Sequence, residues 1–515
     1  MKNYKDLTIK EKIGQLIVCG FTHDYYDDHV STLVEKYNVG NVILFARNFK
    51  NANQMKKLCQ DLHANIYNKI GAYPFIAIDQ EGGMVTRMMK DVTFAPSQMT
   101  TSATSVENAS YEAGKAIGRD MIMLGLNWDY APCLEINPNL MNNNHNIRCY
   151  TSTPESCGKM AGEFMRGLGE YGVISCAKHF PGSGDSTKDS HLELDVVTAT
   201  VERMKNFTLV PFKMNINVPS IMTTHVKFQA LDDEYPATLS KSVLQGLLRK
   251  ELGYQGMIIS DAVGMKAIAD NYGAANGAAM ALIAGCDMVL SCHELSEQEE
   301  VFKKVYEAYE KGELTEEMID EKLARIWKYK EQILPFLNKY FFGNDKPYEE
   351  DKKQSALMQE IVDKSVTIVK GELPKVGNDT LIFAPVACVA SQAEDVFDER
   401  DLALELKKRL PNTVLKFENT PEFYELAMKE VKKASDVVVF SYDTGKNKVQ
   451  IDIINEVIKM FGKKAYIVSL KGPMDMVYFK DVENYTVLYE YTPNSIRTII
   501  KLVEGKLKAE GKLPY

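Results

Sequence analysis

The stretch that decides the fold reads V-I-S-C-A-K-H-F-P-G-S-G-D-S-T-K-D-S-H and runs from Val173 to His191. Its beginning is mostly apolar and predicts a buried β-strand over 173–177. The basic pair Lys178 and His179 is therefore expected where this strand meets solvent. The proline and the two glycines that follow prevent regular structure, so we expect the second half to form a loop. A buried strand that leads into ionisable side chains indicates a place for chemistry.

Asp189 and His191 bring a carboxylate and an imidazole together on this loop. Because the two residues are separated by one position, the carboxylate can orient the imidazole and stabilise its charged form. A histidine held in this way can carry protons near neutral pH. The alternative is a solvated, glycine-rich turn with incidental charges, and the stretch by itself leaves that alternative open.

The length and composition are those of a globular protein with more than one domain. A chain of 515 residues exceeds what one core usually supports, so we expect two domains, or one large barrel with an appendage. The hydrophobic fraction of 45% and the charged fraction of 25% are ordinary for a soluble protein. A net charge of -9 without a basic stripe argues against nucleic acid as the main partner.

The cysteines and the N-terminal segment bear on location. Nine cysteines are scattered without C-x-x-C pairs, which is typical of reduced core residues in a cytosolic protein. No run approaches the length of a membrane span, and the apolar stretch that ends at Cys19 is preceded by charged residues and lacks the core of a signal peptide. We therefore expect a cytoplasmic protein that does not bind membranes. The sequence does not indicate an oligomeric state.

Strand-like runs alternate with helical patterns over the first part of the chain, after a segment from Leu7 to Val39 that is expected to be helical. The runs lie at 41–45, 74–78, 126–130, 173–177, 220–224, 256–260 and 287–291. Strands separated by helices of this length predict parallel βαβ units, and their number favours a closed, TIM-like (β/α)8 barrel. The alternative is an open doubly wound sheet, but a G-x-G-x-x-G fingerprint after the first strand is not present.

A change of composition between Asn338 and Lys353 marks the expected domain boundary. We place the barrel at 1–342 and a C-terminal domain at 343–515. The C-terminal part repeats an α/β pattern, with expected strands at 380–383, 414–417, 437–442, 466–470 and 486–489 and helices near 403–409, 421–434 and 450–461. This pattern predicts a smaller three-layer α/β/α sandwich rather than a second barrel.

Ionisable residues fall at or just past the ends of the expected barrel strands. They are Asp79, Lys178, His179, His225 and Asp261. Catalytic groups of (β/α) barrels sit at the C-terminal ends of the strands, so these positions agree on a site at one mouth. A carboxylate at Asp261 and a proton donor on the loop are the equipment for displacing a leaving group at an acetal carbon. The alternative for Asp261 is an ordinary helix N-cap.

Other candidates carry less information on their own. Asp79 opens D-Q-E-G-G, where two glycines let backbone approach a ligand, so Asp79 is interpreted as a hydroxyl-binding acceptor or as part of an ordinary turn. Arg87 and Arg148, seen alone, are more often surface charges or structural ion partners. His225 is either a pocket residue or a satisfied core histidine. The histidines lack the spacing of zinc proteases and cysteine clusters are absent, so we expect no metal site and no cofactor.

These motifs together resemble glycoside hydrolase family 3, in particular the bacterial β-N-acetylglucosaminidases. The matching segments are I-G-Q-L, I-D-Q-E-G-G-M-V-T-R, K-H-F-P-G-S-G-D-S-T-K-D-S-H, M-T-T-H-V, P-A-T-L-S-K and G-M-I-I-S-D-A-V-G-M-K-A-I, with a weaker match in G-K-L-K-A-E-G-K-L-P-Y. The resemblance covers nearly the whole barrel. Its central motif, together with S-D-A, is highly specific.

The resemblance implies a retaining exo-β-N-acetylhexosaminidase that releases terminal N-acetylglucosamine, with cell-wall muropeptide fragments as a source of substrate. It places the nucleophile on Asp261 and the acid/base on His191, paired with Asp189. It also implies sugar contacts by Asp79, Arg87, Arg148, Lys178 and His179. The alternatives are a β-glucosidase or a glycoside phosphorylase on the same barrel, and a silent sugar-binding protein that would have lost the nucleophile or the acid.

The sequence departs from the family pattern in two places. Ser183 stands between two glycines where the family commonly has histidine. The residues at 142–146 read N-N-N-H-N where the family commonly has N-P-V-I-G before the arginine, here Arg148. These departures bear on sugar specificity more than on the type of reaction.

Overall fold

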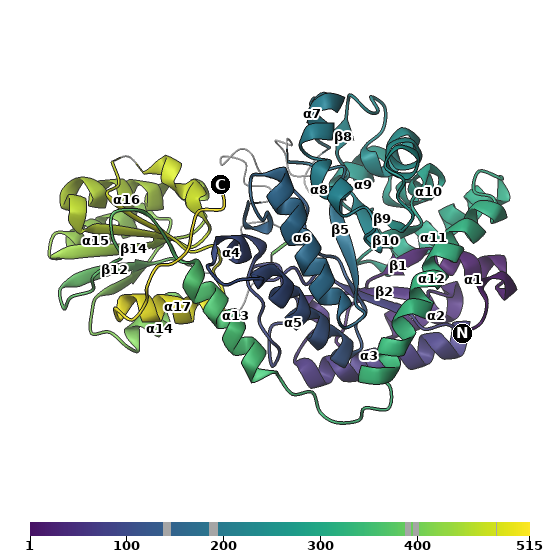
Figure 1. Ribbon diagram of the computed structural model, residues 1–515, viewed down its shortest axis with the longest axis horizontal. Helices are drawn as coiled ribbons and strands as arrows, with labels where there is room; N and C mark the ends of the chain where they lie inside the picture. Colours follow the sequence, from purple (N-terminus) through teal and green to yellow (C-terminus); the bar gives the residue numbers. More distant parts are fainter. Residues whose placement is uncertain (137–145, 185–193, 387–392, 395–400, 480) are drawn as a thin grey trace.

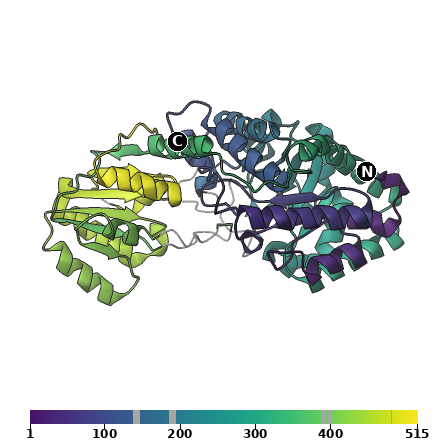
Figure 2. The same ribbon diagram turned by 90° about the horizontal axis from the view of Figure 1, so that it is seen from below.

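The chain folds into two lobes that lie side by side (Figures 1 and 2). This computed structural model describes residues 1–136, 146–184, 194–386, 393–394, 401–479 and 481–515. Asp189 and His191 fall outside these residues, as does most of the departure at 142–146. Each lobe has its own buried apolar cluster, so the expectation of more than one core agrees with the structure.

Parallel strands close the larger lobe into a barrel in the order β1-β10-β9-β7-β5-β4-β3-β2. They are β1 (Ile17–Cys19), β2 (Asn41–Leu44), β3 (Phe75–Ile78), β4 (Trp128–Asp129), β5 (Ile174–Phe180), β7 (Ser220–Thr223), β9 (Met257–Ala262) and β10 (Met288–Ser291). The strands are almost continuously buried, as expected where side chains fill the barrel on one face and helices cover the other. The predicted (β/α)8 barrel is confirmed.

Helices surround this barrel. They are α1 (Ile9–Gly14), α2 (Asp28–Tyr37), α3 (Ala52–Ile70), α4 (Gln98–Ala103), α5 (Ala109–Leu124), α6 (Pro154–Gly169), α7 (Val201–Asn206), α8 (Val210–Met214), the π-helical η5 (Ser242–Glu251), α9 (Lys266–Tyr272), α10 (Ala274–Ala284), α11 (Leu295–Glu310) and α12 (Glu316–Tyr340). Local sequence sets their ends. In α3, for example, Asn51 accepts a hydrogen bond from the Gln54 amide at the start, and Gly71 ends the helix with a φ of 78°.

None of the described helices combines the length and apolar character needed to cross a bilayer.

Short elements connect these helices and strands. They are η1 (Tyr4–Asp6), η2 (Ala46–Asn48), η3 (Asn146–Arg148), η4 (Ala237–Leu239), η6 (Thr444–Lys446), η7 (Gly462–Lys464), η8 (Pro473–Tyr478) and the parallel pair β6 (Val196–Val197) and β8 (Lys227–Phe228). The β6 and β8 pair stands apart from the barrel sheet.

Two expectations about the barrel were wrong in detail. The first strand, β1, lies inside the segment from Leu7 to Val39 that was expected to be helical. A three-residue apolar run cannot be assigned by periodicity, and its pairing with β10 and β2 makes it a strand. Strand β5 also continues through Phe180, so Lys178 and His179 are buried within it rather than placed where the strand meets solvent.

The smaller lobe is a three-layer α/β/α sandwich, as predicted. Its sheet has the order β11-β16-β15-β14-β12-β13, with β11 antiparallel at one edge. The strands are β11 (Thr367–Lys370), β12 (Thr380–Ala384), β13 (Val414–Lys416), β14 (Asp436–Ser441), β15 (Ala465–Ser469) and β16 (Asn484–Val487). Helices α15 (Pro421–Val431) and α16 (Lys448–Phe461) lie on one face, and α13 (Lys352–Ser365), α14 (Leu402–Lys407) and α17 (Pro493–Val503) on the other (Figure 1). Strand β11 was not predicted from the sequence.

Hydrogen bonds join the two lobes. The Asn494 side chain donates to the Phe94 carbonyl over 2.9 Å. The end of the chain returns to the barrel lobe, where the Lys512 amide donates to the Ala103 carbonyl over 2.9 Å. The interface therefore involves the segment that follows β3.

Candidate active site

A buried lysine occupies the centre of the barrel mouth. The Lys178 ammonium lies 2.8 Å from Asp79 Oδ1 and 2.6 Å from Glu81 Oε1. Burial would lower the pKa of Lys178, but the Asp79 and Glu81 carboxylates outweigh it and hold that pKa above its ordinary value. Lys178 is therefore a fixed cation that holds two carboxylates in place.

Glu81 and Arg148 form a bidentate ion pair beside this lysine. Arg148 Nε lies 3.0 Å from Glu81 Oε2, and Arg148 Nη2 lies 2.8 Å from Oε1. Burial would raise the pKa of the Glu81 carboxyl, yet Arg148 and Lys178 hold it well below its usual range. Glu81 thus links Lys178 to Arg148 and fixes the orientation of both cations.

Asp79, Glu81, Arg148 and Lys178 form one ion cluster, and Arg87 connects it to the smaller lobe. Its Nη2 lies 3.5 Å from Asp79 Oδ2, and its Nη1 donates to the Ala393 carbonyl over 2.8 Å. Gln80 accepts the amides of Arg87 and Met88 at its side-chain oxygen, which holds this loop in place. Arg87 is thus an ion-pair partner of Asp79 and a contact between the lobes, rather than a surface charge.

Glu135 organises the other side of the mouth. Its fully buried carboxylate accepts the His179 amide over 3.2 Å, and the Ser183 amide and hydroxyl over 2.6 and 2.9 Å. It also lies 3.4 Å from His179 Nδ1. Ser183, at the position where the resemblance leads us to expect histidine, is buried and donates both its amide and its hydroxyl to Glu135.

Asp261 lies on β9 at the same mouth and keeps part of its carboxylate accessible. Its Oδ1 accepts the Ala262 amide over 2.8 Å, and its Oδ2 lies 4.0 Å from His179 Nε2. The side chain is 19% exposed, whereas that of Glu135 is 0% exposed. The alternative of a helix cap is wrong, because α9 begins at Lys266 and Met265 occupies its N-cap position. Asp261 can therefore reach a ligand in the mouth.

His225 is a satisfied core histidine that supports the nucleophile candidate. Its Nε2 lies 2.9 Å from the Ala262 carbonyl and its Nδ1 lies 2.8 Å from Thr238 Oγ1. The residue is fully buried and both of its ring nitrogens have a partner, so these contacts are structural. By binding the backbone next to Asp261, it fixes the end of β9.

Six of the eight candidate site residues lie within the described part of the chain, and all six lie at one mouth of the barrel. They are Asp79, Arg87, Arg148, Lys178, His179 and Asp261. Asp189 and His191 lie outside the described residues, so their positions stay predictions. The sequence analysis missed Glu81 and Glu135. Glu81 stood in the D-Q-E-G-G motif and could have been found there, whereas no sequence pattern marked Glu135.

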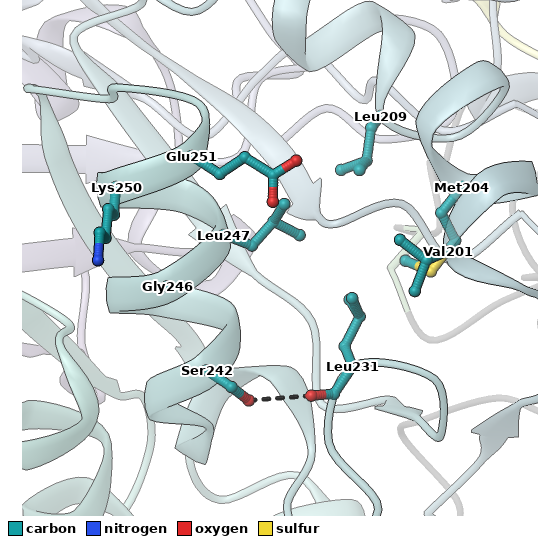
Figure 3. A pocket seen from close by; sticks show the side chains of 9 residues that line it. All are labelled: Val201, Met204, Leu209, Leu231, Ser242, Gly246, Leu247, Lys250 and Glu251. Carbon is teal, nitrogen blue, oxygen red and sulfur yellow. Dashed lines mark hydrogen bonds between the residues drawn. The ribbon is translucent and has the colours of Figure 1, made fainter.

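A separate pocket of about 560 Å³ lies between α7 and η5 (Figure 3). Its lining is mostly apolar and consists of Val201, Met204, Leu209, Leu231, Ser242, Gly246, Leu247, Lys250 and Glu251. Glu251 pairs with Lys205 over 2.6 Å. The pocket shares no lining residue with the ion cluster, and its apolar surface does not suit a sugar.

Within the described residues, no group of three or more His, Cys, Asp or Glu side chains is arranged to hold a metal ion.

Comparison with known proteins identifies the family of the chain. The model of the glycosyl hydrolase family 3 N-terminal domain matches residues 8–329. The chain is 27% identical to beta-hexosaminidase A of Pseudoalteromonas piscicida, over 94% of this chain and 90% of that protein. It is 35% identical to a beta-hexosaminidase of Haemophilus influenzae, over 50% of this chain and 73% of that protein.

Solved structures show the same architecture. A glycoside hydrolase family 3 β-N-acetylglucosaminidase from Paenibacillus sp. str. FPU-7 superposes with a TM-score of 0.92 at 31% identity, covering 99% of this chain and 98% of that one. A β-glucoside phosphorylase superposes with a TM-score of 0.81 at 24% identity, covering 99% of this chain and 94% of that one, which shows a shared fold. The protein is a glycoside hydrolase, and its substrate is a carbohydrate. The chain belongs to glycosyl hydrolase family 3.

Proposed function

We propose that the protein is a retaining exo-β-N-acetylhexosaminidase that releases terminal N-acetylglucosamine. The observation that carries the proposal is the position of Asp261, a carboxylate at the end of β9 that is 19% exposed and lies 4.0 Å from His179, whereas Glu81 and Glu135 of the same site are 2% and 0% exposed. The substrate is taken from the relatives, which are named as beta-hexosaminidases and a β-N-acetylglucosaminidase. A partly exposed carboxylate at the C-terminal end of a barrel strand suits the role of nucleophile.

In the proposed reaction Asp261 attacks the anomeric carbon while His191, oriented by Asp189, protonates the leaving oxygen. The bond from the anomeric carbon to the leaving oxygen breaks as the bond to the aspartate oxygen forms. His191 then takes a proton from water, which attacks the anomeric carbon and releases Asp261. A histidine acid avoids a second anion beside the nucleophile, which would otherwise raise the pKa of one carboxyl.

The buried ion cluster would bind the sugar. Asp79, Arg87, Arg148, Lys178 and His179 are the proposed contacts to its hydroxyl groups, as the resemblance implied. Because Lys178 and Arg148 are each held by carboxylates within 3.0 Å, their remaining donors have fixed directions before the sugar arrives. Donors and acceptors fixed in advance reduce the reorganisation required on binding.

Covalent trapping tests the nucleophile directly. A fluorinated glycosyl donor should label Asp261, and mass spectrometry of the digested protein would locate the label. Labelling of another carboxylate would contradict the assignment.

The proton donor is tested by His191→Ala, which should slow substrates with poor leaving groups far more than activated aryl glycosides. Equal losses on both substrates would make His191 a structural residue.

Substrate and acceptor need separate assays. Aryl N-acetylglucosaminide should be cleaved much faster than aryl glucoside, and added phosphate should leave the rate and the product unchanged. A preference for glucoside would identify a β-glucosidase, and formation of a sugar phosphate would identify a phosphorylase. Release of N-acetylglucosamine from muropeptide fragments would test the proposed natural source.

Two further expectations stay proposals. The division into a catalytic barrel at 1–342 and a C-terminal domain at 343–515 is supported by the family match to residues 8–329 and by the separate sheets of the two lobes. A cytoplasmic location is supported by the cysteines, since those described are buried free thiols. Fractionation of cells that express the full-length protein would test the location.

A further inference from the structure

The loop that carries Glu81 is pressed against a second segment of the barrel lobe. Gly82 and Gly83 have φ angles of 93° and 57°, which favour glycine. A Cβ atom at Gly82 would collide with the Pro96 carbonyl, and one at Gly83 would collide with the Ser97 side chain. The Glu81 loop therefore packs directly against Pro96 and Ser97.

A carboxylate from the smaller lobe holds Ser97. Glu490 is fully buried, and its Oε2 accepts the Ser97 amide over 2.7 Å and the Thr100 hydroxyl over 2.9 Å. Its Oε1 accepts the Thr492 hydroxyl over 2.6 Å. The Ser97 hydroxyl lies 3.1 Å from the Tyr489 carbonyl, to which it donates. We call Ser97, Thr100, Tyr489 and Glu490 the interlobe clamp.

Apolar packing reaches the same loops. Met84, Met99, Ala103 and Ile147 come from the barrel lobe but belong to the buried apolar cluster of the smaller lobe. Met84 follows Glu81 by three residues, and Ile147 directly precedes Arg148. Both partners of the Glu81 and Arg148 ion pair therefore stand on backbone that is anchored in the smaller lobe.

We propose that Glu490 is a positioning residue for the sugar-binding side of the active site, acting through Ser97 on the loop that carries Glu81. The smaller lobe is thereby part of the binding machinery although Glu490 itself touches no substrate. The site it positions is the one assigned under the proposed function, so this inference rests on that assignment.

The clamp should affect binding more than the chemical step. Asp261 stands on β9, and the neighbouring Ala262 carbonyl is held by His225, in an arrangement that shares no residue with the clamp. Loosening the clamp would let Glu81 move and with it the cations that Glu81 orients. The expected result is a higher KM with a nearly unchanged kcat.

The test compares Glu490→Ala, Glu490→Gln and Glu510→Ala in the full chain. Glu510 is the matched control, because it is also a carboxylate of the smaller lobe that accepts a hydroxyl of the barrel lobe, from Ser105 over 3.0 Å, but it is exposed and lies outside the clamp. With 4-nitrophenyl N-acetylglucosaminide, we expect Glu490→Ala to raise KM about tenfold, as for the loss of a buried hydrogen-bond acceptor, with kcat within threefold. Glu510→Ala should behave like the wild type.

Glu490→Gln should restore most of the binding, with KM within about threefold of the wild type, because its amide oxygen can still accept the Ser97 amide. Hydrogen exchange of peptides that cover residues 79–101 supplies a readout that needs no substrate. Exchange there should accelerate about tenfold in Glu490→Ala, while exchange of the peptide that carries Asp261 stays unchanged. Thr100→Val, which removes one donor to Glu490, should shift KM and exchange in the same direction by about threefold.

Three results would overturn the proposal. The first is a Glu490→Ala protein with lower thermal stability but unchanged KM and unchanged exchange over 79–101. The second is an equal effect of Glu490→Ala and Glu510→Ala. If Glu490→Ala does not fold, the third is an absence of any change in Thr100→Val. A wild type that cleaves no aryl glycoside would contradict the proposed function, and the exchange measurements would still decide whether the clamp holds the loop.

Discussion

The two ends of the barrel each bury a lysine, and the two lysines have opposite ionisation behaviour. At the mouth, Asp79 and Glu81 hold the pKa of Lys178 above its ordinary value. At the other end, burial lowers the pKa of Lys330 to about 7. The Lys330 amino group donates to neutral partners, Gln15 Oε1 over 3.2 Å and the Gly40 carbonyl over 3.1 Å. A buried lysine remains a firm cation only where carboxylates face it.

The two lysines lie at ends of the barrel with different roles: Lys178 belongs to the candidate active site, and Lys330 belongs to the opposite, closed end. Gln15 and Gly40 stand just before β1 and β2, so Lys330 closes the N-terminal end of the barrel. Its amino group lies 5.3 Å from the ring centres of both Phe75 and Trp327. The ion cluster and Asp261 lie at the opposite end of the barrel, where the strands terminate. Active sites of (β/α) barrels sit at the C-terminal ends of the strands, whereas the N-terminal ends serve stability.

The largest expected effect lies at the mouth. Asp261→Asn should lower kcat on the order of 10³-fold or more, because it removes the proposed nucleophile and with it the proposed covalent step. The free energy of unfolding should change little, since Asp261 is 19% exposed and asparagine has nearly the same size. Steady-state kinetics with an aryl N-acetylglucosaminide and urea unfolding measure the two quantities. A kcat within tenfold of the wild type would place the nucleophile elsewhere.

The next effect compares the two lysines directly. Lys178→Met should lower the free energy of unfolding by about 3 to 5 kcal/mol, because it leaves the buried Glu81 and the partly buried Asp79 without this cation. It should also lower kcat/KM about 100-fold through the displaced sugar contacts. Denaturant unfolding and kinetics of the same preparation check both values. Unchanged stability would mean that Asp79 and Glu81 are compensated by Arg87 and Arg148 alone.

Lys330→Met should change the pH dependence of stability and leave kcat unchanged. Between pH about 7 and the unfolded-state value near 10.4, the unfolded chain holds a proton that the folded protein does not. The free energy of unfolding of the wild type therefore rises with pH in this window, by up to about 1.4 kcal/mol per unit. The variant lacks this contribution. Urea unfolding of both proteins at pH 7 to 10 gives the difference, and parallel curves would show that Lys330 stays charged.

The smallest effect is expected at an ion pair of the supporting end. Asp287 accepts Arg249 over 2.6 Å, Arg325 over 2.9 Å and the Ile258 amide over 2.7 Å. Arg325→Gln removes one of these partners while Arg249 remains, and the Arg325 side chain is 28% exposed. The free energy of unfolding should fall by about 1 kcal/mol with kcat unchanged. A loss of activity would connect this end of the barrel to the reaction.

Much of the fold followed from patterns along the chain. The run at 220–224 became β7 at Ser220–Thr223, and the run at 287–291 became β10 at Met288–Ser291. Short apolar runs that alternate with helical patterns are typical of strands buried in a sheet that helices cover. Strands β1 and β11 were missed. Their runs are short, and their assignment depends on pairing with distant strands rather than on periodicity.

The candidate site, like the fold, could be predicted from the sequence only in part. The sequence by itself determined which ionisable residues stand at strand ends, because a parallel barrel brings those ends to one mouth. It also supplied the motifs that identify the family. Only the tertiary structure decided what each residue does there: that Lys178 is buried between Asp79 and Glu81, that Glu135 holds His179 and Ser183, and that Glu490 of the other lobe reaches Ser97. The physical reason is that burial and charge partners, which set ionisation and orientation, come from residues far apart in the chain.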